Sequence, residues 1–281
     1  MILSRSRRIA FVHIPKCAGT AIRRQLAPLD ETGGRYFGVA DLPGIGPIRM
    51  SHLPLAVLRA QFPEDHAALA ASRAYAVCRE PEARFVSSVA QYLREHRGTE
   101  LSALAPAAAR DEVRRLIDAL GDERAALTRL ELNHFQRQVD FVFEEGGEDG
   151  GEDGGESEDC GGRRQVVGHV YPIEAMAALA RRLMEETGLP VSADLRSNET
   201  LNVRSRRTLG TLRRLNATAG RMLPRGVHAR LRQGVKGLVS RGPAAAGILD
   251  APELRDFVAR RYAADRALYD ECRARLAAGP A

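Results

Sequence analysis

Two hydrophobic patterns alternate along the chain: short apolar runs, and longer segments with one apolar face. Short apolar runs between polar or turn residues are typical of buried strands, and apolar residues at intervals of three and four are typical of helices. Strands that alternate with helices predict an α/β fold, with a mainly parallel sheet covered by helices. The predicted strands are residues 8–14, 48–52, 74–79 and 165–170.

Helical spacing predicts most of the remaining elements. The last predicted helix starts near Asp250 and continues to the end of the apolar pattern at Cys272. Asp265 falls within its apolar face, where a lone carboxylate would be costly, so we expect it to be part of an ion pair. The other predicted helices are residues 19–26, 55–61, 82–95, 111–120, 123–138 and 173–187.

Length and composition are those of a globular protein. The chain has 281 residues, of which 44% are hydrophobic and 28% charged, so residues 1–281 are predicted to form a single domain. No apolar run is long enough to cross a bilayer, and no apolar stretch follows the basic residues of MILSRSRR. The pattern indicates neither a signal peptide nor membrane insertion, so the expected location is cytoplasmic.

The cysteines do not form a metal or disulfide motif. Cys17, Cys78, Cys160 and Cys272 lie far apart and include no CxxC spacing. The simplest expectation is a reduced protein without a metal. The sequence leaves the oligomeric state open.

The charge is divided unevenly along the chain. The net charge is +6, but residues 144–159 hold nine acids and no base, so the rest of the chain carries +15. Glycine and acidic residues cannot bury a core, so residues 144–163 are predicted to be a disordered insertion. Two interpretations remain open for it: a solvated spacer, and an intramolecular mimic of an acidic ligand.

A basic insertion is predicted at residues 204–249, which hold 11 Lys or Arg and no acid. Leu209, Leu212 and Leu215 have helical spacing, so part of it is expected to be an amphipathic helix. It could be a solvated face, a surface for an acidic substrate or nucleotide phosphate, or a membrane or nucleic-acid surface. Aromatic residues are only 5% and no nucleic-acid module is evident, so nucleic acid is not an expected partner.

The segment FVHIPKCAGTAI has the features of an anion-binding loop. It places a loop and a helix start after the first predicted strand, where free amide groups face a ligand in parallel α/β sheets. Gly19 permits close backbone approach, Thr20 offers a hydroxyl and Lys16 adds a positive charge. These features suit a phosphate or a similar tetrahedral anion, although the order differs from the GxxxxGK[ST] of an NTPase loop.

A second anion motif follows a second strand, in YAVCREPEARFVSS. The guanidinium of Arg79 can hold two phosphate oxygens, and the hydroxyl of Ser87 can complete the site. The alternative is that Arg79 pairs with a carboxylate and Ser87 caps or packs. Two anion sites at two strand ends imply a ligand with two separated anionic groups.

HIPKCAGT and CREPEARFVSS together resemble the cofactor-binding signatures of a known family. This family comprises the sulfotransferases related to carbohydrate sulfotransferases and heparan-sulfate 2-O-sulfotransferase, which use 3′-phosphoadenosine 5′-phosphosulfate (PAPS). The resemblance continues, in family order, in MSHLP, NHFQRQ, LNVRSR and DFVARRYAADRALYDE. It implies a P-loop-like fold and transfer of a sulfuryl group to a hydroxyl, most readily of a saccharide, without a metal.

The resemblance also implies roles for individual residues. It assigns His52 as the general base, with a histidine packed at a strand end as the alternative, and it gives Lys16 a catalytic role beside the leaving phosphate oxygen. Arg79 and Ser87 would bind the 3′-phosphate of PAPS. The residues implied for the 5′-phosphosulfate are Lys16, Cys17, Ala18, Gly19, Thr20 and Ala21, and those implied for the acceptor are Asn133, Gln136 and Arg137.

Two other function classes remain open from the residues alone. A nucleotide-dependent phosphotransferase would need Mg²⁺ and an acidic metal ligand near a strand end, and no such motif is evident. A non-enzymatic module could instead use residues 204–249 to bind a polyanion. The chain also departs from the family where many relatives have an acidic residue, since it has Tyr171 and Pro172 there.

Overall fold

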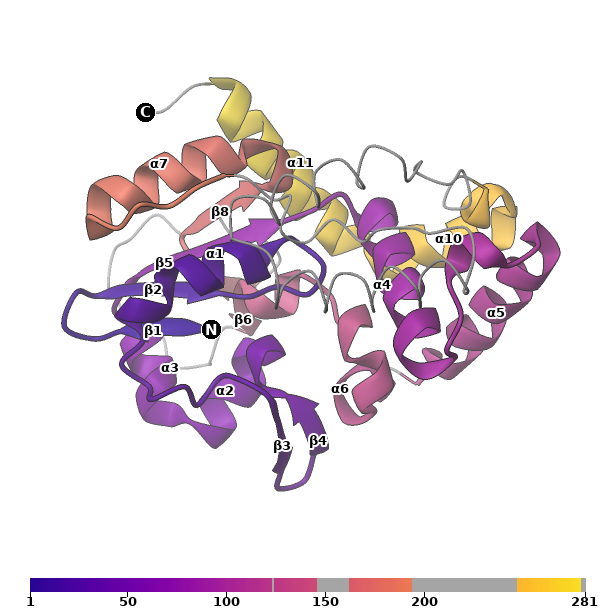
Figure 1. The fold of residues 1–281 in the computed structure, drawn as a ribbon, viewed down its shortest axis with the longest axis horizontal. Coiled ribbons are helices and arrows are strands. Elements are labelled where there is room, and N and C mark those ends of the chain that lie inside the picture. The colour runs from indigo at the N-terminus through magenta and orange to yellow at the C-terminus, as the bar shows by residue number, and fades with distance from the viewer. Residues whose placement is uncertain (123, 146–161, 194–246, 279–281) are drawn as a thin grey trace, which may run out of the picture.

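A four-stranded sheet forms the centre of the computed structural model, which describes residues 1–122, 124–145, 162–193 and 247–278 (Figure 1). The strand order is β1-β2-β5-β8, in which β2, β5 and β8 are parallel and β1 is an antiparallel edge. The predicted α/β class is therefore confirmed as a mixed, mostly parallel sheet flanked by helices. The strands are β1 (Ile2–Ser4), β2 (Ile9–Val12), β5 (Arg73–Cys78) and β8 (His169–Pro172).

The central strands β2 and β5 are apolar because both of their faces are covered. All four residues of β2 and the last five of β5 are buried, as expected for inner strands of a parallel sheet. The register pairs Val12 with Ala76 and Cys78 with Pro172. The loops that follow β2 and β5 therefore leave the same edge of the sheet.

Helical spacing predicted most of the helices. The helices predicted at 19–26 and 55–61 have the predicted bounds, and the helix predicted at 173–187 ends at Thr187, followed by the C-cap Gly188, whose φ of 70° is typical of that position. α3 (Pro63–Ala70) was not predicted, although Pro63 at its first position and two acids in its first turn are start signals. The others are α1 (Gly19–Leu26), α2 (Leu55–Gln61), α4 (Pro81–His96), α5 (Pro106–Ala119) and α7 (Met176–Thr187).

The helix predicted at residues 123–138 is wrong. Its described part contains the short helix α6 (Ala125–Thr128) and a 3-10 helix, Leu130–Phe135, and Gln136 is extended. The side chain of Asn133 bonds the carbonyls of Ala126, Leu127 and Arg129, and its oxygen accepts the N–H of Arg49. Such side-chain bonds compete with the regular helical ladder.

Two predicted strands are also misplaced. The strand predicted at 48–52 is β4 (Gly46–Arg49), which among the described strands pairs with β3 (Val39–Leu42) alone, and Met50–His52 is a 3-10 turn. The strand predicted at 165–170 is divided between two sheets. Val166 and Val167 both donate to the carbonyl of Val142, so the chain leaves one sheet before it enters the other at His169.

The last predicted helix is two helices, α10 (Pro252–Arg261) and α11 (Ala263–Ala278). They break at Tyr262, whose hydroxyl donates to the carbonyl of Phe135 at 2.8 Å. The expected ion pair of Asp265 is confirmed, since its carboxylate lies 3.3 Å from the guanidinium of Arg84 and both side chains are fully buried.

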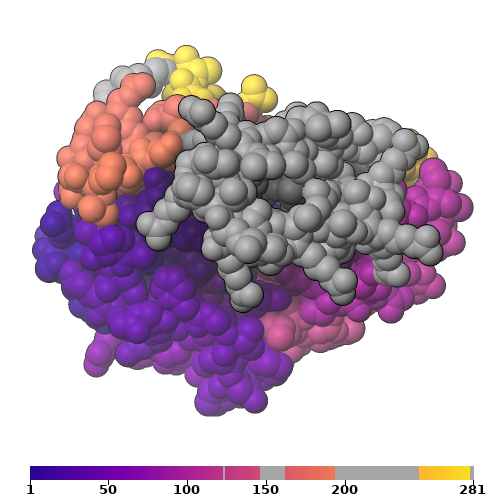
Figure 2. Space-filling view, viewed as in Figure 1, coloured from indigo at the N-terminus to yellow at the C-terminus, as the bar shows by residue number. Residues whose placement is uncertain are grey.

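Two hydrophobic cores organise the described residues. One surrounds the sheet, and the other lies among α4, α5 and α10, where Phe85, Val113 and Val258 are buried together. Figure 1 shows this second group of helices beside the sheet, and Figure 2 shows the indigo N-terminal surface and the magenta surface of α5 at opposite ends of the molecule. Because α4 begins where β5 ends, it connects the edge of the sheet to the second core.

The ends of the predicted acidic insertion are ordered. β6 (Phe143–Glu145) pairs antiparallel with β7 (Arg163–Gln165), and Glu145 lies opposite Arg163. Disorder is therefore wrong for residues 144, 145, 162 and 163, and residues 146–161 lie outside the described residues. The basic insertion also lies outside them up to residue 246, and its last residues begin the 3-10 turn Ile248–Asp250.

Candidate functional site

The loop between β2 and α1 has an unusual backbone. Lys16 and Ala18 have φ values of 64° and 60°, in the left-handed region that non-glycine residues seldom adopt. Such conformations persist where the surrounding structure requires them, and they gather at ligand sites. α1 begins at Gly19 with no side-chain cap and no acid in its first turn, so no side chain competes with an anion for the amides of Gly19 and Thr20. The N–H of Ala21 donates to the carbonyl of Ala18 at 3.2 Å.

Residue 19 must be glycine because the side chain of His13 packs against it. A Cβ atom on Gly19 would lie 2.3 Å from Cδ2 of His13, which is far inside contact distance. The imidazole of His13 therefore packs directly against the start of α1. We predicted that Gly19 permits close approach of an anion, and the structure places the side chain of His13 against it.

Gln138 connects the two predicted anion motifs. Its Oε1 accepts the N–H of Arg79 at 2.8 Å, and its Nε2 donates to the carbonyl of Arg79 at 2.8 Å. The same Oε1 lies 3.2 Å from Sγ of Cys17. Burial raises the pKa of Cys17 to about 12, so its thiol is neutral and only its backbone is available to an anion. Gln138 was not predicted, although it is the last residue of NHFQRQ.

The guanidinium of Arg79 reaches the first motif directly. Its Nη1 donates to the carbonyl of Lys16 at 3.3 Å, and Arg79 has no carboxylate partner among the described side chains. The structure therefore does not support the alternative that Arg79 pairs with a carboxylate of the described residues. The loop after β2 and the residue after β5 are therefore in direct contact, as their shared sheet edge predicts.

One face of α4 completes this cationic site. The ammonium of Lys16 donates to Oε1 of Gln91, which lies one turn after Ser87, and Arg94 follows at helical spacing. Burial, and then the charges of Arg94 and Arg79, lower the pKa of Lys16 to about 8. Ser87 is half-buried on this helix. A bound anion would relieve the repulsion among these cations.

His52 is held in one tautomer. It is buried, and its Nδ1 lies 3.0 Å from the carbonyl of His13. A carbonyl only accepts, so Nδ1 carries the hydrogen and Nε2 carries the lone pair. Burial lowers the pKa of His52 to about 3, against the opposing effect of this hydrogen bond, so the ring is neutral. The rings of His13 and His134 lie 4.5 and 5.4 Å away.

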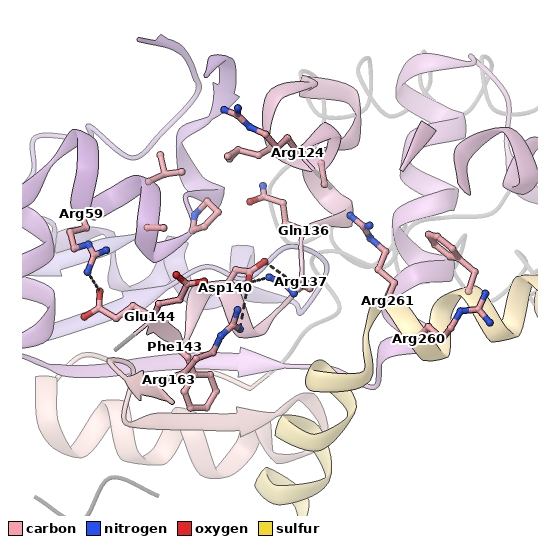
Figure 3. Close-up of a pocket in the computed structure, with 17 residues that line it drawn as sticks. Arg59, Arg124, Gln136, Arg137, Asp140, Phe143, Glu144, Arg163, Arg260 and Arg261 are labelled. Carbon is pink, nitrogen blue, oxygen red and sulfur yellow. Dashed lines mark hydrogen bonds and ion pairs between the residues drawn. The ribbon is translucent and has the colours of Figure 1, made fainter. Parts of the chain in front are cut away.

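The three residues predicted to contact an acceptor have different environments. Asn133 is fully buried and uses its amide to join β4 to α6, so the structure gives it a packing role. Gln136 donates to the carbonyls of His52 and Asn133, at 3.3 and 3.0 Å. Arg137 pairs with Asp140 at 2.8 Å. Gln136 and Arg137 both line a pocket of about 710 Å³ (Figure 3).

The remaining observations concern metals, membranes and relatives. Within the described ranges, no three His, Cys, Asp or Glu side chains are grouped so as to hold a metal ion. None of the helices in those ranges is both long and apolar enough to cross a bilayer. Comparison of the chain with family models, curated proteins and solved structures finds no match.

Proposed function

We propose that this protein is a PAPS-dependent sulfotransferase that transfers a sulfuryl group to a hydroxyl, most readily of a saccharide, on a P-loop-like fold. The observation that carries the proposal is the 3.3 Å contact between the guanidinium of Arg79 and the carbonyl of Lys16. Through it, two anion motifs from two strand ends meet in one site. PAPS has two separated anionic groups, and the sequence resemblance assigns one to each motif.

The cationic site fits such a ligand. Two arginines, Arg94 and Arg79, lie close enough to Lys16 to lower its pKa. None of these three cations forms an ion pair with a described carboxylate. The open amides at the start of α1 would hold the 5′-phosphosulfate together with Lys16. Arg79 and Ser87 would hold the 3′-phosphate, and Arg94 adds a positive charge that sequence reasoning missed.

His52 is neutral, as a general base must be, although its lowered pKa of about 3 makes it a weak proton acceptor in the unliganded protein. A hydroxyl is a poor nucleophile at neutral pH, and Nε2 of His52 can accept its proton as the acceptor oxygen bonds to sulfur. The bond between sulfur and the phosphate oxygen then breaks, and the charge of Lys16 stabilises that leaving oxygen. The products are a sulfated acceptor and adenosine 3′,5′-bisphosphate.

The variant His52→Asn tests this role. Asparagine can still donate a hydrogen bond to the carbonyl of His13, but it cannot accept the hydroxyl proton. We expect unchanged affinity for adenosine 3′,5′-bisphosphate and a loss of about 10² or more in PAPS turnover with saccharide acceptors. His169→Asn is the matched control, because His169 stacks on Tyr75 at 4.9 Å and has no proposed role. Full turnover by His52→Asn would overturn the assignment.

A further inference from the structure

A chain of hydrogen-bonded side chains connects Lys16 to β4. The ammonium of Lys16 donates to Oε1 of Gln91, and Nε2 of Gln91 donates to Oε1 of Glu95 at 2.7 Å. The other carboxylate oxygen of Glu95 lies 2.8 Å from Nη2 of Arg49, the last residue of β4. Gln91 and Glu95 lie one turn apart on α4. The chain therefore joins the loop before α1, the helix α4 and the strand β4.

The two neighbours of Gln91 fix the orientation of its amide. An ammonium group only donates hydrogen bonds and a carboxylate only accepts them, so the amide oxygen must face Lys16 and the nitrogen must face Glu95. Exchanging the two amide atoms would break both bonds. Gln91 therefore holds the ammonium of Lys16 in one defined place, and Arg49 holds Glu95 in turn.

The bond to Gln91 leaves Lys16 able to bind an anion. An ammonium group has three N–H donors, and Gln91 accepts from one of them. No ion pair joins Lys16 to a carboxylate within the described ranges. Because the side chain of Gln91 has no net charge, it orients the ammonium without neutralising it, as a carboxylate at this position would.

We propose that Gln91 is a positioning residue for Lys16, which it holds ready for the 5′-phosphate end of the ligand, with Glu95 and Arg49 as its supports. A side chain that is already in place loses little conformational freedom when the ligand binds. The inference rests on the proposed function only in naming that ligand. The bond between Gln91 and Lys16 does not depend on it.

The titration of Lys16 reports this bond directly. A hydrogen bond to the charged ammonium stabilises that form, so its loss should lower the pKa of Lys16 below its value of about 8. Burial raises the pKa of Cys17 to about 12 and lowers that of His134 to about 2, so neither group titrates near pH 8. The charged or titratable groups that act on Lys16 are Arg94, Arg79, Glu95, Cys17 and His134.

Carbon-13 NMR of protein with labelled lysine measures this pKa without any ligand. The chain has only two lysines, Lys16 and Lys236, so Lys236→Arg assigns both signals. In Gln91→Leu, we expect Lys16 to titrate at a pH about 1 lower than in the wild type. Gln61→Leu, which removes an amide that bonds the carbonyl of Pro43, is the control and should leave the titration unchanged.

A second variant exchanges the two polar groups of α4. Gln91→Glu combined with Glu95→Gln keeps the net charge and keeps a donor or an acceptor at each link of the chain. It places the carboxylate beside Lys16, so Lys16 should titrate at a higher pH than in the wild type. A role in packing alone would not move the pKa in opposite directions. An unchanged pKa of Lys16 in both variants would overturn the inference.

Calorimetry with adenosine 3′,5′-bisphosphate at pH 7 tests whether this position matters for binding. Gln91→Leu should weaken binding about tenfold. Because Gln91 acts through Lys16, adding Gln91→Leu to Lys16→Met should weaken binding no further than Lys16→Met alone. Additive losses, or unchanged or tighter binding by Gln91→Leu, would overturn the inference and leave the proposed function standing. If the wild type does not bind the bisphosphate, the proposed function fails, and the NMR titration still decides whether Gln91 positions Lys16.

Discussion

The side-chain amide of Gln138 pairs with the backbone of Arg79 as a neighbouring strand would. It accepts the N–H and donates to the carbonyl, each at 2.8 Å, directly after the last residue of β5. Through the contact of its Oε1 with Cys17, it also joins this strand end to the loop before α1. A fully buried glutamine therefore fixes the relative positions of the two anion motifs.

Gln138→Leu should disturb both stability and ligand binding. It leaves the N–H and carbonyl of Arg79 without partners, so we expect the free energy of unfolding to fall by about 2 kcal/mol. Misplacement of Arg79 should also weaken bisphosphate binding. Urea unfolding and calorimetry measure the two effects. Gln61→Leu, which removes one exposed contact to Pro43, is the control, and equal losses in both variants would contradict the account.

Neighbouring substitutions at the start of α1 should have opposite effects. Gly19→Ala places a methyl group against His13 and should lower the free energy of unfolding by about 1–3 kcal/mol. Ala18→Gly relieves a left-handed alanine and should raise it by about 0.5 kcal/mol. Thermal unfolding of both variants checks the pair. Equal tolerance of alanine and glycine at residue 19 would contradict the close approach of His13.

The charge of Lys16 predicts how ligand affinity depends on pH. Its pKa is lowered to about 8, so Lys16 is positively charged below pH 8 and neutral above it. The proposed role needs the charged form, so bisphosphate affinity should be nearly constant below about pH 7 and fall as the pH rises through 8. Lys16→Arg keeps its charge throughout this range and should show no such fall. Coincident profiles for the two proteins would rule out titration of Lys16.

The pair of Arg84 and Asp265 should be strongly coupled. Both side chains are fully buried, so Asp265→Asn leaves the buried guanidinium of Arg84 without its counter-ion and should cost about 3–5 kcal/mol. The double variant Arg84→Met with Asp265→Leu removes both charges and should cost less than the single variants Arg84→Met and Asp265→Leu together. A double-mutant cycle by urea unfolding measures the coupling, and strict additivity would contradict it.

The sequence predicted elements where local pattern decides the structure. The apolar faces of α1 and α2 gave their bounds, and the positions of the two anion motifs after strands predicted that they would share one edge of the sheet. The side chains that join these motifs could not be identified in this way. Gln138 and Gln91 act across 59 and 75 residues, and no local spacing indicates such contacts. Arg94 continues the face of Ser87 and Gln91, which is a signal that helical spacing could have provided.

Two of the errors have the same physical origin. The segment 123–138 has helical spacing, but Asn133 bonds Arg49 and the preceding carbonyls, and these bonds override the local preference. The break at Tyr262 depends on a bond to Phe135, which is 127 residues away. In both places the backbone conformation depends on a long-range hydrogen bond. A pattern of apolar positions carries no information about such a bond.

The most direct test of the central claim is calorimetric titration with adenosine 3′,5′-bisphosphate, compared with ATP and Mg²⁺. We predict that the bisphosphate binds, that Mg-ATP binds much less tightly, and that Arg79→Ala abolishes bisphosphate binding. Arg73→Ala, which removes an exposed arginine at the other end of β5, should bind as the wild type does. No binding of the bisphosphate, a preference for Mg-ATP, or unchanged affinity in Arg79→Ala would contradict the sulfotransferase proposal.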